Sequence, residues 1–182
     1  MTDAPSLSYP DPPLTDGTVL LRRWLLTDLG CVEEATHDPY IPETTTVPQT
    51  YCDAEGRAWI HRQWARADDA TGLSLAVADA RSGEAVGLVV LTARPGPRCA
   101  SVGYWTIPGA RGRGYASGAV GLLTRWALTH GGLTRIEAYV EPDNTPSQRI
   151  LEGIGFHREA YLPSKLPLPT RRADVIRYSL TQ

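Results

Sequence analysis

The sequence has 182 residues, a length that suits a single compact domain with its own hydrophobic core. Hydrophobic residues make up 42% of the chain and charged residues 21%, which excludes a disordered or collagen-like protein. The sequence contains no apolar run of about eighteen residues, and its first residues lack the basic-then-apolar pattern of a signal peptide. We therefore expect a cytoplasmic protein without a membrane partner.

The distribution of charge along the chain is uneven. The net charge of −2 argues against a nucleic-acid partner. Residues 1–84 hold six Arg and fourteen acidic residues, whereas residues 85–136 hold six Arg and no acidic residue. This acid-free segment indicates a place where an anionic ligand binds. The three cysteines lack metal-ligand or redox spacing, and we expect no metal site.

The spacing of apolar residues and turn residues predicts a mixed α/β domain. Residues 1–17 are rich in proline and end in Asp16-Gly17, which predicts an N-terminal arm before a single domain over residues 18–182. Helices are expected where apolar residues recur at helical spacing, and strands where β-branched and apolar residues fill short runs. The predicted elements are, in order, a strand at 18–24, a helix at 27–35, a long loop at 37–52, a helix at 53–67, strands at 74–78, 85–91 and 99–107, a helix at 114–130, a strand at 135–140, a helix at 145–154, and strands at 156–161 and 173–180.

The most informative segment is a glycine-rich turn between a predicted strand and a long predicted helix. It reads Ile107-Pro108-Gly109-Ala110-Arg111-Gly112-Arg113-Gly114-Tyr115-Ala116. Glycines let consecutive N–H groups point into one concavity, and the positive end of the helix dipole adds to them, a combination that binds phosphates. The segment has neither the Lys-Ser/Thr of a Walker loop nor the spacing of a dinucleotide loop. The alternative is a tight, soluble turn without a ligand.

Two motifs carry a resemblance to a known family. Arg111-x-x-Gly114-x-Ala116 resembles the Q/R-x-x-G-x-G/A loop with which GNAT N-acetyltransferases bind the pyrophosphate of acyl-CoA. Asn144-x-x-Ser147-x-Arg149-Ile150-Leu151-Glu152-x-x-Gly155-Phe156 resembles the second motif of the branch that includes the ribosomal-protein N-terminal (alanine/serine) acetyltransferases. The order of elements is similar over residues 17–181. The resemblance implies a mostly antiparallel GNAT-type sheet of seven strands, with splayed parallel central strands and about four helices.

The resemblance also implies acetyl-CoA as the co-substrate. The splayed strand, the turn and the start of the next helix would bind it, and Asn144 would hydrogen-bond the pantetheine arm. The implied cofactor-binding residues are Trp105, Thr106, Ile107, Arg111, Gly112, Arg113, Gly114, Tyr115, Ala116, Ser117, Asn144, Ser147 and Arg149.

The resemblance suggests one catalytic acid and leaves the base open. Ser147 would protonate the departing thiolate, although serine is also common in the first turn of a helix, where Thr145 is the expected cap. Glu137 and Tyr139, the latter through water, are the candidates for proton removal from the amine, with Glu84 and Asp174 as alternatives. Relatives often carry an acid where this chain has Ser101, and a structural salt bridge is the alternative role for each acidic residue.

The acceptor is expected to be an amine that attacks the thioester directly. An α-amine has a pKa of about 8 and a lysine amine one of about 10.4, so a weak base suffices for an α-amine. This favours a protein or peptide N-terminus, with a small polyamine-like or aminoglycoside-like amine and a non-catalytic acyl-CoA-binding module as alternatives. Exposed edge strands are compatible with a homodimer. The candidate substrate-binding residues are Tyr40, Glu43, Tyr161 and Asp174.

Overall fold

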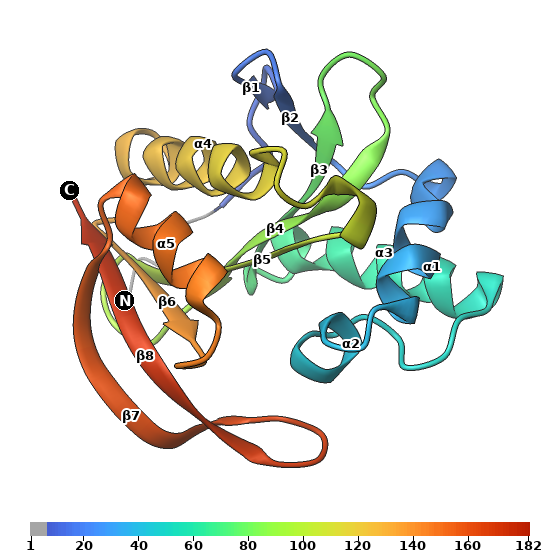
Figure 1. The fold of residues 1–182 in the computed structure, drawn as a ribbon. Coiled ribbons are helices and arrows are strands. Elements are labelled where there is room, and N and C mark those ends of the chain that lie inside the picture. Colours follow the sequence, from blue (N-terminus) through green and yellow to red (C-terminus); the bar gives the residue numbers. More distant parts are fainter. Residues whose placement is uncertain (1–6) are drawn as a thin grey trace.

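The chain forms one twisted sheet with helices on both faces, as Figure 1 shows. The computed structural model describes residues 7–182, and no helix in that range is long and apolar enough to cross a membrane. The strands are β1 (Leu14–Thr15), β2 (Val19–Arg22), β3 (Gly72–Asp79), β4 (Ala85–Ala93), β5 (Cys99–Thr106), β6 (Arg135–Val140), β7 (His157–Pro167) and β8 (Arg172–Thr181). The α-helices are α1 (Leu29–His37), α2 (Ile41–Thr44), α3 (Asp53–Asp68), α4 (Tyr115–Thr129) and α5 (Thr145–Ile154).

The predicted mixed, mostly antiparallel sheet with parallel central strands is confirmed. The strand order is β1-β2-β3-β4-β5-β6-β8-β7, and β5–β6 is the parallel pair. Within the described residues the sheet has eight strands instead of the seven expected. The additional strand is β1, which pairs with β2. The Asp16 side chain stabilises the turn between them by accepting hydrogen bonds from the N–H groups of Thr18 and Val19.

The N-terminal segment is packed against the domain from Leu7 onward. Leu7 is buried in the main core, and Tyr9 packs against it. The prediction of an arm over residues 1–17 falls partly on residues 1–6, which lie outside the described residues.

Two proline-rich segments are more ordered than the sequence predicted. The expected loop at 37–52 contains α2, the fifth α-helix where about four were expected. The Asp38 carboxylate accepts hydrogen bonds from the first N–H groups of this turn, and Pro42 sits where a helix needs no N–H donor. The strand β7 extends to Pro167 because it is an edge strand, where proline removes no ladder hydrogen bond.

Hydrophobic side chains fill a core on each face of the sheet. Helices α4 and α5 cover one face, and α1, α2 and α3 cover the other face at the β2–β5 half (Figure 1). On the second face the rings of Trp24, Trp59 and Trp105 lie 5.0–6.2 Å apart, centroid to centroid. The burial of β3 on both faces explains its nearly continuous apolar sequence. Because Trp105 belongs to β5, this packing holds β5 in place next to β6.

The central strands separate after a short paired region. Strands β5 and β6 pair only from Cys99↔Arg135 to Ser101↔Glu137. Beyond that point β5 continues its pairing with β4, and β6 continues with β8. A wedge therefore opens in the middle of the sheet, which confirms the predicted splay.

Candidate active site

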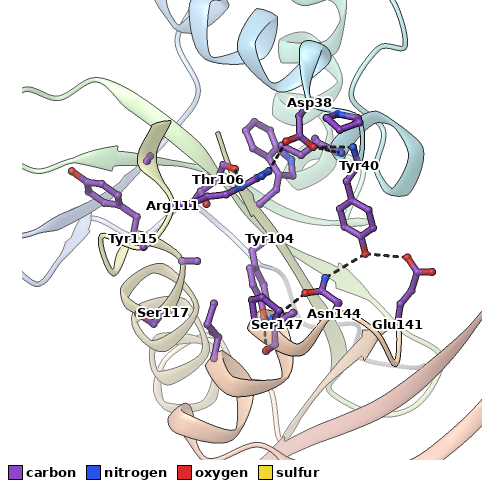
Figure 2. Close-up of a pocket in the computed structure, with 18 of the residues that line it drawn as sticks. Asp38, Tyr40, Tyr104, Thr106, Arg111, Tyr115, Ser117, Glu141, Asn144 and Ser147 are labelled. Carbon is purple, nitrogen blue, oxygen red and sulfur yellow. Dashed lines mark hydrogen bonds and ion pairs between the residues drawn. The ribbon is translucent and has the colours of Figure 1, made fainter. Parts of the chain in front are cut away.

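The wedge between β5 and β6 opens into a cavity of about 960 Å³. The N-terminal ends of α4 and α5, the segment before α2 and the end of the β7–β8 hairpin surround it, as the close-up in Figure 2 illustrates. The lining residues include Asp38, Tyr40, Tyr104, Trp105, Thr106, Arg111, Gly112, Gly114, Tyr115, Ala116, Ser117, Glu141, Asp143, Asn144, Ser147 and Arg171.

The glycine-rich turn and the first residues of α4 line this cavity. Gly112 and Gly114 adopt φ angles of +74° and +85°, values that a side chain at Cβ makes costly. Gly114 is the N-cap of α4, and helix geometry leaves the N–H groups of the first turn without partners inside the helix. A Cβ placed at Gly112 or Gly114 would meet no atom within 4 Å, so the space beside this turn is open. The turn fits an anionic group such as a pyrophosphate.

Arg111 does not extend freely into the cavity. Its Nη2 atom lies 2.7 Å from Asp38 Oδ2, and its Nε donates to the Thr106 carbonyl oxygen at 3.2 Å. Burial raises the pKa of Asp38, but hydrogen bonds from the backbone N–H groups of Ile41 and Tyr40 and from Arg111 outweigh burial and hold it below its ordinary value. The ion pair therefore joins the glycine-rich turn to the segment before α2.

The ion pair leads to a prediction for stability. We expect Asp38→Asn to lower the free energy of unfolding at pH 7 by about 1–3 kcal/mol, since hydrogen bonds to a charged group are lost. Because the folded-state pKa of Asp38 lies below 3.8, its stabilisation is present above pH 4 and disappears as the pH falls through the folded-state pKa. Urea unfolding at pH 7 and pH 3 measures this, with the exposed Asp11→Asn as the control. An equal loss at both pH values would contradict the assignment.

Arg113 and Tyr115 form a second link at the start of α4. The Arg113 guanidinium lies 5.2 Å from the centroid of the Tyr115 ring. The Tyr115 hydroxyl donates to the Asp79 carboxylate, and this hydrogen bond, together with those from the Ser82 and Arg81 N–H groups, lowers the pKa of Asp79 to about 2. Figure 2 shows the Tyr115 side chain pointing away from Ser147 and Asn144. The contact of Tyr115 with the end of β3 anchors the start of α4. Arg113, a predicted cofactor-binding residue, does not line the cavity.

Two hydroxyl groups meet inside the wedge. Tyr104 Oη lies 2.6 Å from Ser147 Oγ, and either atom can be the donor. Burial raises the pKa of Tyr104 to about 12, so its hydroxyl keeps its proton near neutral pH. The sequence predicted Ser147 but not Tyr104, although alternation along β5 places Tyr104 on the α5 side with the buried Val102.

Asn144 orients Ser147. Its Oδ1 atom accepts a hydrogen bond from the Ser147 N–H at 3.1 Å, which makes Asn144 the N-cap of α5. The expectation that Thr145 caps this helix is wrong, because Thr145 is the first residue of the helix and the side chain of Asn144 accepts the capping hydrogen bond. The Asn144 amide nitrogen donates to Tyr40 Oη at 3.3 Å, so its side chain lies between Ser147 and the far end of the cavity.

The far end of the cavity combines Tyr40, which the sequence predicted, with Glu141 and Arg171, which it did not. Tyr40 donates to Glu141 Oε1 at 3.0 Å, and Arg171 Nη2 lies 2.6 Å from Glu141 Oε2. Glu43, a predicted substrate-binding residue, contacts Arg171 at 3.4 Å but does not line the cavity. Arg171 reaches this end because the β7–β8 hairpin extends toward α2 (Figure 1).

The two predicted bases lie in a different cluster. Tyr139 donates to Glu137 Oε2 at 2.5 Å, and Arg135 donates to Glu137 Oε1 at 3.0 Å. Burial raises the pKa of Glu137, but these hydrogen bonds outweigh burial and lower it below the ordinary value. Neither Glu137 nor Tyr139 lines the cavity, because alternation along β6 points them to the face opposite Ile136 and Ala138.

Four other predicted residues lie away from the cavity lining. Tyr161 donates to Asp174 across the β7–β8 hairpin, and neither residue lines the cavity. Arg149 is exposed on α5. Ile107 donates its N–H to the Val86 carbonyl at 3.0 Å, so this N–H is bound to β4 instead of facing the wedge. The indole of Trp105 belongs to the tryptophan cluster on the other face, and only part of the residue borders the cavity.

The wedge, the glycine-rich turn and the paired hydroxyls fit an acyltransferase that uses a CoA thioester, the class that the sequence resemblance implies. Residues 18–157 match the family described as an acetyltransferase (GNAT) domain, and the chain belongs to this family of acetyl-CoA-dependent N-acetyltransferases. The family resemblance seen in the sequence is thereby confirmed. Within the described residues, no group of three or more His, Cys, Asp or Glu side chains is arranged to hold a metal ion.

Relatives with similar sequences are also N-acetyltransferases by name. The chain is 24% identical to the uncharacterized N-acetyltransferase YnaD of Bacillus subtilis, over 93% of this chain and 96% of that protein. It is 40% identical to the uncharacterized N-acetyltransferase p20 of Bacillus licheniformis, but over only 44% of this chain and 46% of p20. RimJ of Mycobacterium smegmatis, solved with CoA-disulfide, superposes with a TM-score of 0.80 at 25% identity, over 93% of this chain and 85% of RimJ.

Structures of the same fold act on different acceptors according to their names. They include RimL, a ribosomal L7/L12 alpha-N-protein acetyltransferase that is 18% identical with a TM-score of 0.79. They also include a chimera of the spermidine N-acetyltransferase SpeG, 20% identical with a TM-score of 0.73. The fold therefore does not select the acceptor.

Proposed function

We propose that the acceptor is the α-amine of a protein or peptide N-terminus. The observation that carries this proposal is the pairing of acidic side chains with arginines around the cavity: Glu141 and Glu43 contact Arg171, and Asp38 contacts Arg111. A polyamine has several positive charges and favours a site with uncompensated carboxylates. Among the lining acids in the described part of the chain, only the exposed Asp143 has no arginine within ion-pair distance.

The proposed cofactor contacts follow from the geometry of the wedge. The N–H groups of the first turn of α4 would bind the pyrophosphate. Because the Thr106 carbonyl oxygen faces Arg111 and away from β4, alternation along β5 turns the backbone groups of Tyr104 toward the wedge as well. These groups would hydrogen-bond the pantetheine amides. Acetyl-CoA, when bound, supplies an acetyl group on a thiol leaving group.

The Tyr104–Ser147 pair is the proposed proton donor for the thiol. The Ser147 hydroxyl lies in the wedge, and the Tyr104 hydroxyl is next to it at 2.6 Å. Because burial raises the pKa of Tyr104 to about 12, the pair retains its protons at the pH where an α-amine becomes neutral. The role of Asn144 is to hold Ser147 in place through the N-cap hydrogen bond.

The proposed acceptor can be tested with a thiol-release assay. We expect acetyl-CoA turnover with peptides that carry a free N-terminal alanine or serine, and at least about 10-fold lower kcat/KM with N-acetylated peptides that offer only a lysine amine, because the lysine amine is rarely neutral. Spermidine and an aminoglycoside complete the panel. Faster turnover of either small amine would overturn the proposal, and acetyl-CoA binding without turnover of any amine would favour a binding module.

A further inference from the structure

We propose that Glu141 is the residue that removes the proton from the acceptor amine and that Tyr40 holds its carboxylate in position. This inference rests on the proposed function, because it places the attacking amine at the Tyr40–Glu141 end of the cavity. Glu141 follows β6 directly, and its side chain is 13% exposed. The backbone of β6 therefore fixes the carboxylate at the mouth of the wedge.

The position of Glu141 relative to the hydroxyl pair supports this role. Tyr40 donates to Glu141 at 3.0 Å and accepts from Asn144, while Asn144 in turn binds the N–H of Ser147. Figure 2 shows this series of contacts along one side of the cavity, from Glu141 to the residues in the wedge. An amine next to Glu141 would thus face a thioester whose sulfur lies near Ser147.

The other acidic residues of the cavity are less suited to accept a proton. Asp38 is occupied by the N–H groups of Tyr40 and Ile41 and by Arg111, and its side chain is only 3% exposed. Asp143 is exposed in the turn before α5 and has no side-chain hydrogen bond within the described residues. Glu141 combines partial burial with an orientation fixed by Tyr40 and Arg171.

The two carboxylate oxygens of Glu141 have different partners. Oε2 contacts Arg171, whereas Oε1 accepts the Tyr40 hydroxyl, and each carboxylate oxygen has two lone pairs. Burial and the Glu141 carboxylate raise the pKa of Tyr40, so Tyr40 remains a donor and does not compete for the proton of the amine. A lone pair of Oε1 is left for the amine.

These residues account for every proton that moves during the transfer of the acetyl group to the amine. The amine nitrogen bonds to the thioester carbonyl carbon, and the carbon–sulfur bond breaks. One amine proton passes to Glu141, and the departing sulfur receives a proton from the Tyr104–Ser147 pair. Glu141 then releases its proton to solvent and the hydroxyl pair regains one from solvent, which restores the enzyme.

Substitution of Glu141 tests the proposal. We expect Glu141→Gln to reduce kcat, with the most active acceptor of the panel at saturation, by about 100-fold or more, the usual effect of removing a general base. Acetyl-CoA affinity, measured by titration calorimetry, should stay within about 2-fold of the unsubstituted protein, which also verifies folding. The acid limb of the pH profile of kcat should flatten in Glu141→Gln and persist in Glu141→Asp, which retains a carboxylate.

Glu159→Gln is the matched control. Glu159 is also a carboxylate paired with arginines, Arg135 and Arg177, but it lies on β7 outside the cavity lining. We expect its kcat to stay within about 2-fold. Formate should restore part of the activity of Glu141→Ala, because it replaces the missing carboxylate, and should leave the activity of Glu159→Gln unchanged.

Three outcomes would overturn the proposal. The first is a kcat of Glu141→Gln within about 3-fold of the unsubstituted protein. The second is an effect on acceptor KM alone with an unchanged acid limb, which would make Glu141 a binding residue. The third is an acid limb that Glu141→Asp fails to keep. These measurements use the most active acceptor of the panel, so a small amine as best acceptor would refute the proposed function and still decide the role of Glu141.

Discussion

Replacement of Gly114 by Asp is expected to reduce acetyl-CoA affinity by about 100-fold or more. The new carboxylate would stand at the N-cap of α4, beside the N–H groups that we propose to bind the pyrophosphate. Two unit charges about 5 Å apart repel by about 3 kcal/mol at an effective dielectric constant of about 20, which gives the stated loss. The apo protein should remain folded, because a carboxylate is favourable at a helix N-terminus and offsets part of the strain at φ +85°.

Gly114→Asn separates charge from backbone strain. Asparagine has nearly the same shape as aspartate and tolerates a positive φ, but it is neutral. Titration calorimetry with acetyl-CoA should give this variant an affinity at least about 10-fold higher than that of Gly114→Asp. Equal affinities for the two variants, or undiminished binding by folded Gly114→Asp, would remove the pyrophosphate from this turn.

Removal of the two hydroxyls in the wedge is expected to slow turnover without loss of acetyl-CoA binding. Ser147→Ala and Tyr104→Phe should each lower kcat by about 100-fold or more, in the range for loss of a general acid. Because the two hydroxyls share one hydrogen bond of 2.6 Å, the double variant should be only slightly slower than the slower single variant. Steady-state kinetics on the four proteins measures this coupling.

A change of leaving group distinguishes proton donation from a structural role. An acetyl thioester with a more acidic thiol needs less protonation as it departs. Such a thioester should therefore restore much of the rate that Ser147→Ala loses relative to the unsubstituted protein. It should restore little of the rate that Glu141→Gln loses, because that variant lacks the proposed base and not the acid. Full additivity of Ser147→Ala and Tyr104→Phe, together with no rescue by the acidic thiol, would contradict a shared acid.

The parts of the site that depend on local sequence could be predicted. The glycine-rich turn and the start of α4 follow from residues that are neighbours in the chain, and Gly112 and Gly114 have the positive φ angles that such a turn needs. The predicted bounds of β6 and α5 agree with the structure. The splay was implied by the family resemblance, and Pro108 is consistent with it because proline ends strand pairing.

The parts of the site that depend on contacts between distant residues could not be predicted from the sequence. Arg111 and Asp38 are 73 positions apart, and Tyr40 and Glu141 are 101 positions apart, so no local pattern links them. Glu137 was a predicted base, but alternation along β6 turns it to the other face of the sheet, and Glu141 was not among the candidates. The strand before β8 was predicted to end at residue 161, so the extension of β7 to Pro167, which brings Arg171 to the cavity, was missed.

The separation of β5 from β6 also bears on folding and aggregation. Unpaired backbone groups at the outer edge of a sheet can recruit strands of other chains. In this protein part of the unpaired edge lies in the interior, between two strands that are each held on their other side by β4 and β8. A narrow cofactor arm can enter there, but a folded neighbour cannot. Each bound acetyl-CoA would complete the hydrogen bonding of the sheet, and at a concentration 100 times Kd it would stabilise the fold by about 2.7 kcal/mol.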